Sequence, residues 1–85
     1  MYKVTYTKQA ERSLLKLPRD LALRVREKLE QIALVPYAQH NNVTKLQNRP
    51  GYRLRVGDWR VIYEIHDGEL IVLVLKIAPR GNVYL

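Results

Sequence analysis

The stretch Tyr52–His66, YRLRVGDWRVIYEIH, predicts a β-hairpin with a two-residue turn at Gly57-Asp58. Apolar and polar side chains alternate on both sides of the turn, and a period of two is typical of half-buried strands. A two-residue loop also determines which residues are opposite each other. It predicts three cross-strand pairs: Val56 with Trp59, Arg55 with Arg60, and Arg53 with Ile62.

Because successive side chains point to opposite faces of a sheet, this hairpin has one apolar and one basic face. The apolar face is expected to contact helices and consists of Tyr52, Leu54, Val56, Trp59, Val61, Tyr63 and Ile65. Arg53, Arg55 and Arg60 share the other face. Like charges directly opposite each other destabilise a sheet. A bound phosphate would relieve this repulsion, because a guanidinium group can donate two parallel hydrogen bonds to phosphate oxygens. The basic face therefore predicts a phosphodiester-binding site; the alternative is a solvated face that keeps a small protein soluble.

The segments before the hairpin predict a strand and two helices. Residues 2–7 alternate as a strand does. A short helix follows from Lys8 and ends near Pro18, since proline lacks the amide proton that a helix interior needs. A second helix has an apolar stripe formed by Leu21, Val25, Leu29 and Ile32. Residues 35–44 are expected to form one long loop.

The segments after the hairpin predict more β-structure. Asp67-Gly68 favours a turn, and 69–77 form an almost continuous apolar strand that is covered on both faces. Residues 82–85 could add a short terminal strand. The predicted fold is a single α+β domain over 1–85: an N-terminal strand, a two-helix hairpin, and a three- to four-stranded, mainly antiparallel sheet.

Alternation also places apolar residues on the arginine-bearing face. These are Ile62, Ile71, Leu73, Leu75 and, at the end of the strand, Ile77. So large an apolar surface needs a cover, which either the terminal segment or a partner would provide.

The composition limits the class of protein. The 85 residues have a formal net charge of +7, which favours nucleic acid, an anionic surface or an acidic protein as a partner. The chain has no cysteine, which excludes a disulfide scaffold, and no apolar run long enough for a membrane span. A cytoplasmic location is expected. His40 and His66 are not spaced as metal ligands, and no nucleotide-binding motif is present, so no metal or cofactor is expected.

Two stretches carry a resemblance to a known family. Residues 45–63, KLQNRPGYRLRVGDWRVIY, and the tail 78–84, APRGNVY, resemble the core and the last signature of the RelE/ParE toxin superfamily. The N-terminal strand and helices fit as well, so the resemblance spans the chain. It implies the RelE-like microbial RNase fold and a toxin of a type II toxin–antitoxin system. Its implied partners are mRNA, the 70S ribosome and an acidic, RelB-like antitoxin.

The resemblance further implies a metal-independent endoribonuclease, or mRNA interferase, that cleaves mRNA in the ribosomal A site and inhibits translation. The matching candidate catalytic residues are Arg53, Arg55, Arg60, Arg80 and Tyr84. The matching RNA-binding residues are Lys45, Arg49, Arg53 and Arg55. Arginine stands at 53 and 55 where many mRNA-cleaving members have lysine, and Pro79 stands where several have histidine.

Two other functions remain open at this point. One is inhibition of DNA gyrase without cleavage of any substrate, as in ParE-like members. The other is a catalytically degenerate module that binds only RNA or its antitoxin. The presence of both Arg80 and Tyr84 favours the endoribonuclease, because ParE-like members usually lack that pair.

Overall fold

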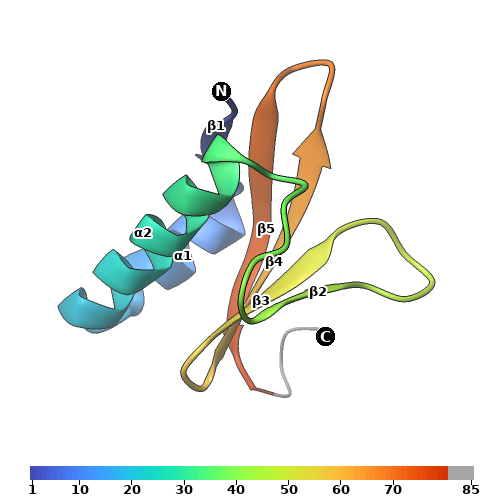
Figure 1. Ribbon diagram of the computed structural model, residues 1–85. Coiled ribbons are helices and arrows are strands. Elements are labelled where there is room, and N and C mark those ends of the chain that lie inside the picture. The colour runs from blue at the N-terminus through green and yellow to red at the C-terminus, as the bar shows by residue number, and fades with distance from the viewer. Residues whose placement is uncertain (81–85) are drawn as a thin grey trace.

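A five-stranded mixed sheet with two helices on one side forms the protein, and the computed structural model describes residues 1–80 (Figure 1). The strands lie in the order β1-β5-β4-β3-β2. In chain order the elements are β1 (Lys3–Tyr6), α1 (Lys8–Lys16), α2 (Arg19–Leu34), β2 (Val43–Lys45), β3 (Tyr52–Val56), β4 (Trp59–His66) and β5 (Ile71–Pro79). The predicted α+β class is confirmed; the predicted strand at 82–85 lies outside the described residues.

The two helices form where the sequence predicts them. The Thr7 side-chain oxygen accepts a hydrogen bond from the Ala10 amide at 3.2 Å, which caps the start of α1. Pro18 separates α1 from α2. The predicted stripe of α2 faces the sheet, with Val25, Leu29 and Ile32 buried. None of the helices in residues 1–80 is long and apolar enough to cross a membrane.

The central hairpin has the predicted register. Val56 pairs with Trp59 and Arg55 with Arg60, so Gly57-Asp58 is a two-residue loop. The predicted loop over 35–44 is wrong at its end, because Val43 and Thr44 begin β2. This three-residue strand is antiparallel to β3 and gives the sheet its fifth member.

The N-terminal strand lies at the opposite edge of the sheet and is parallel to β5. Only four residues pair, from Lys3 opposite Ile71 to Tyr6 opposite Val74. The Thr7 side chain continues the connection by donating a hydrogen bond to the Leu75 carbonyl oxygen at 2.8 Å.

One irregularity changes the alternation of β5. Tyr63 pairs with Val74 while Ile62 pairs with Lys76, so Leu75 is an extra residue in the ladder. Beyond this bulge, Ile77 joins the core beneath the helices. The prediction that Ile77 is on the arginine-bearing face is therefore wrong. The cause is the bulge, which reverses the alternation of every later residue.

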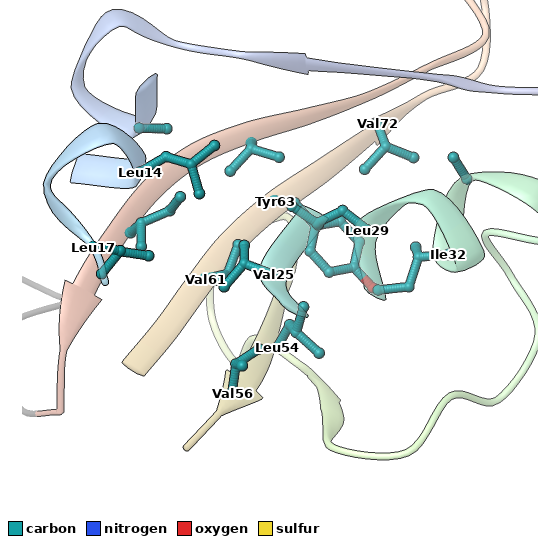
Figure 2. Close-up of a cluster of buried hydrophobic side chains, with 14 residues drawn as sticks. Leu14, Leu17, Val25, Leu29, Ile32, Leu54, Val56, Val61, Tyr63 and Val72 are labelled. Atoms are coloured by element: carbon teal, nitrogen blue, oxygen red, sulfur yellow. The ribbon is translucent and has the colours of Figure 1, made fainter. Parts of the chain in front are cut away.

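The main core lies between the helices and the sheet (Figure 2). Leu29 and Ile32 of α2 meet Tyr63 of β4 there, and Leu14 of α1 packs nearby. The seven hairpin residues predicted for the apolar face all belong to this core or pack against it. The helices therefore cover one face of the sheet and leave the other face for the candidate site.

Candidate functional site

Three arginines lie together on the sheet face that the helices do not cover, and we call this surface the arginine face. Arg55 and Arg60 are direct cross-strand partners, and Arg53 is opposite Ile62. Arg53 and Arg60 are half-buried, whereas Arg55 is exposed. The prediction that alternation brings these three residues to one face is confirmed by the register.

Neutral oxygen atoms hold two of these guanidinium groups. Arg60 Nη1 donates to the carbonyl oxygens of Gly57 at 3.2 Å and of Trp59 at 3.1 Å. Arg55 Nη2 donates to Asn42 Oδ1 at 3.2 Å. These acceptors orient the side chains but carry no negative charge, so they leave the positive charge available to an anion.

Arg53 lies between two hollows. The larger, of about 440 Å³, is lined by Thr44, Lys45, Leu46, Gln47, Arg49 and Arg53. The smaller, of about 290 Å³, is lined by Asn42, Val43, Thr44, Arg53 and Arg55. Four cationic side chains thus border a continuous stretch of surface along β2 and β3.

Lys45 and Arg49, the other two residues predicted to bind RNA, also lie beside this surface. Both are exposed and line the larger hollow. In the register, however, Thr44 is opposite Arg53, while Lys45 is opposite Tyr52. Lys45 is therefore at the edge of the arginine face and does not belong to its central row.

The floor of the arginine face is apolar. Ile62 is 1% exposed and clusters with Ala78, Leu46 and Leu75. Leu46 comes from the segment between β2 and β3, so this segment provides part of the cover that the sequence requires. Ile71 and Leu73 are half-buried farther along β5.

Lys76 is a cation of this face that the alternation of the sequence does not reveal. The bulge at Leu75 places Lys76 opposite Ile62, in the same cross-strand row as Arg53. Without the bulge, the alternation of β5 would assign residue 76 to the helix face. The only feature of the local sequence that could have indicated this placement is a single lysine within the apolar run of β5.

Two further arginines, Arg80 and Arg24, lie near the turn of the central hairpin. The Arg80 amide donates to the Asp58 carbonyl oxygen at 2.8 Å, which holds the last described residue beside the turn. Arg24 of α2 also lies near the turn, since a Cβ atom added to Gly57 would be 3.5 Å from its Nη2. Arg80 is exposed. The predicted catalytic residue Tyr84 lies outside the described residues.

The opposite end of β4 has acidic and aromatic character. The hydroxyls of Tyr2 and Tyr37 both donate to the Asp67 carboxylate at 2.7–2.8 Å, which lowers the pKa of Asp67. The same contact raises the pKa of Tyr37 to about 12. His66 contacts Glu64 at 2.9 Å, which raises the pKa of the imidazole. Within residues 1–80, no three His, Asp or Glu side chains group as metal ligands would.

Comparisons with known proteins identify the family and similar folds. Residues 4–84 match the family described as the ParE toxin of the type II toxin–antitoxin system parDE. No curated protein matches the chain. The archaeal RelE–RelB complex from Pyrococcus horikoshii contains a chain 31% identical to this one, with a TM-score of 0.79, covering 96% of this chain and 98% of that chain.

Two further structures are similar. One is the RelBE2 toxin–antitoxin complex of Mycobacterium tuberculosis, at 27% identity and a TM-score of 0.76, covering 93% of this chain and 98% of that chain. The other is the isolated Escherichia coli RelE toxin, at 20% identity and a TM-score of 0.82, covering 96% of this chain and 87% of that chain. The last likeness concerns the fold alone.

Proposed function

The chain belongs to the ParE toxin family of type II toxin–antitoxin systems, and from the arginines on its open sheet face we propose that it is a ribosome-dependent endoribonuclease. In this proposal the toxin binds in the ribosomal A site and cleaves the mRNA there, which stops translation. The observation that carries the proposal is the direct pairing of Arg55 with Arg60 on the open face of the sheet. Folding gains nothing from that pairing, whereas a bound phosphate would stabilise it.

The proposed reaction is an internal transfer of the phosphodiester. The ribose 2′-oxygen attacks the adjacent phosphorus, and the bond from phosphorus to the 5′-oxygen breaks. The proton of the 2′-hydroxyl is lost and the leaving 5′-oxygen gains a proton, so the products are a cyclic phosphate and a free 5′-hydroxyl. Negative charge develops on the phosphate oxygens in the transition state, where fixed cations are most effective.

Each arginine has a role in this reaction that follows from its chemistry. A guanidinium group stays protonated at physiological pH, so Arg53, Arg55, Arg60 and Arg80 act by charge and not as bases. Arg55 and Arg60 would hold the reacting phosphate, and Arg53, with the two hollows beside it, would hold the neighbouring nucleotides. We assign Tyr84 to the 2′-hydroxyl or to stacking on a base.

An acidic antitoxin is the second partner that we propose. The similar chains from Pyrococcus horikoshii and Mycobacterium tuberculosis are each in a complex with an antitoxin. The net charge of +7 favours an acidic partner here. An antitoxin bound across the arginine face would neutralise it and keep mRNA away.

The test is cleavage of a defined mRNA by the purified toxin, with and without programmed ribosomes, followed by mapping of the new 5′ ends. Cuts in register with codons, bearing 5′-hydroxyls and present only with ribosomes, are expected. The double variant Arg53→Ala/Arg55→Ala is expected to lose them, while Arg12→Ala, which removes an exposed charge from α1, retains them. RNA binding without any cut would indicate a degenerate module instead.

The match to the ParE family favours one other candidate, inhibition of DNA gyrase. A supercoiling assay with purified gyrase tests it directly. Inhibition of supercoiling, a DNA-damage response in cells and unchanged mRNA 5′ ends would together replace the proposed endoribonuclease with this function.

A further inference from the structure

Asn42 holds Arg55 at two points. Its carbonyl oxygen accepts from the Arg55 amide at 2.9 Å, and its side-chain Oδ1 accepts from Arg55 Nη2 at 3.2 Å. Asn42 immediately precedes β2, so the contact joins the start of β2 to the end of β3. Both residues line the smaller hollow of the arginine face.

The backbone of Asn42 explains why asparagine suits this position. Its φ is +66°, in the left-handed region that asparagine, aspartate and glycine adopt more readily than other residues. Of these three, only asparagine presents a neutral acceptor. Aspartate would keep the contact but place a carboxylate against the guanidinium, and glycine would provide no side chain.

The neutrality of this acceptor has a consequence for phosphate binding. Arg55 is exposed, and a free arginine side chain loses much rotamer entropy when a ligand immobilises it. The hydrogen bond to Asn42 restricts the guanidinium before the ligand arrives. Because the amide is uncharged, the full positive charge of Arg55 stays available.

We propose that Asn42 is a positioning residue, which holds the Arg55 guanidinium at the smaller hollow for an RNA phosphate without neutralising its charge. This inference rests on the proposed function. It makes a charge-specific prediction, since a purely structural role would need only the acceptor atom and the left-handed backbone. Aspartate provides both of these and would satisfy a structural role.

The experiment compares Asn42→Gly, Asn42→Asp and the control Asn41→Asp. Asn41 is exposed and lines a different hollow beside α2, so its variant makes the same charge change one residue away. Each protein is assayed for melting temperature, for ribosome-dependent cleavage, and for binding to a single-stranded RNA of about 12 nucleotides across a salt series.

Asn42→Asp is expected to melt at or above the wild-type temperature, yet to bind RNA about tenfold more weakly with a salt slope reduced by about one phosphate contact. Asn42→Gly is expected to weaken binding about three- to tenfold with an unchanged slope. Asn41→Asp is expected to keep its RNA affinity and its salt slope within about twofold of the wild-type values. In an Arg55→Ala background, Asn42→Gly is expected to have no further effect.

Wild-type RNA affinity and salt slope in Asn42→Asp would overturn the inference, because they would reduce Asn42 to a structural turn residue. An equal loss from Asn42→Gly with and without Arg55 would overturn it as well. If the wild-type toxin binds RNA but cuts nothing, the proposed reaction fails while the binding series still decides the role of Asn42. If it binds no RNA, the proposal for Asn42 fails, while the ribosome-dependent cleavage assay still decides the proposed reaction.

Discussion

Gly51 lies against the carbonyl oxygen of Tyr63: a Cβ atom added to Gly51 would be 2.8 Å from that oxygen. The φ of Gly51 is +109°, which other residues rarely adopt. Its own carbonyl oxygen accepts from the Leu46 amide at 3.0 Å, which joins the two ends of the segment between β2 and β3, and the Leu46 side chain packs on the floor of the arginine face. Glycine at this position therefore allows the segment to cover Ile62.

Gly51→Ala is expected to lower the free energy of unfolding by about 1–3 kcal/mol, since it combines backbone strain with a collision against backbone. For a domain of this size each kcal/mol corresponds to about 4–8 °C in melting temperature, so thermal unfolding measures it. Gly68→Ala is the matched control, because a Cβ there would meet nothing within 4 Å. Equal stability of the two variants would contradict the role of Gly51.

Arg60→Ala is expected to reduce ribosome-dependent cleavage by about 10²–10³-fold, the usual cost of removing one fixed donor from a transition state. The fold is expected to survive, because this guanidinium donates to two carbonyl oxygens of its own hairpin. Single-turnover cleavage and circular dichroism measure the two effects. A folded variant that cuts at the wild-type rate would remove Arg60 from the proposed site.

Tyr2→Phe/Tyr37→Phe is expected to raise the pKa of Asp67 toward its ordinary 3.8, because both hydroxyl donors to the carboxylate are lost. In the wild type the lowered pKa stabilises the fold above about pH 4, and this contribution is lost as the pH falls through the folded-state pKa. The variant is therefore expected to lose less stability on acidification. Carboxyl NMR titration and urea unfolding between pH 2 and 6 measure both effects.

Tyr6→Phe is the control for that experiment, since the Tyr6 hydroxyl is buried without a hydrogen-bond partner in the described residues. It removes a hydroxyl elsewhere and is expected to leave the pKa of Asp67 unchanged. An unshifted Asp67 in the double variant would show that the two tyrosines do not determine its titration.

The product of a neighbouring antitoxin gene is expected to contain an acidic segment and to raise the melting temperature of this protein. A partner that binds only the folded state stabilises it by about 4 kcal/mol at a thousandfold excess over Kd. Calorimetric titration followed by thermal unfolding of the complex measures both. Absence of binding, or an unchanged melting temperature at saturation, would rule out that gene product as the partner.

The elements that could be predicted from sequence are those whose signals are local. Gly57-Asp58 and the alternation around it predicted the central hairpin, and with it the three arginines of the candidate site. The strand β2 was missed because three residues carry no period, and Val43 is in a strand only through its pairing with β3. The sequence likewise predicted the first strand but not its parallel pairing with β5.

The unpredicted parts of the candidate site depend on contacts between distant segments. Lys76 belongs to the row of Arg53 only because of the bulge at Leu75, which the uniform apolar run of β5 does not mark. Asn42, the residue before β2, contacts Arg55 of β3, and nothing in the sequence of the predicted loop 35–44 indicates that contact. Alternation within a strand is readable from sequence, whereas an added residue in one strand of a pair is not.

The parallel pairing of β1 with β5 also determines when the protein can fold during its own synthesis. Thr7 and Leu75, which share a hydrogen bond of 2.8 Å, are 68 residues apart in the chain. The nascent N-terminal strand therefore has no partner until β5 has been made, and long-range strand pairing of this kind is slow. At about 5–20 residues per second, the helices emerge seconds before the sheet that they cover can be completed. Native β1–β5 pairing thus follows the synthesis of β5, which leaves an interval in which the proposed antitoxin would meet a chain whose sheet is still incomplete.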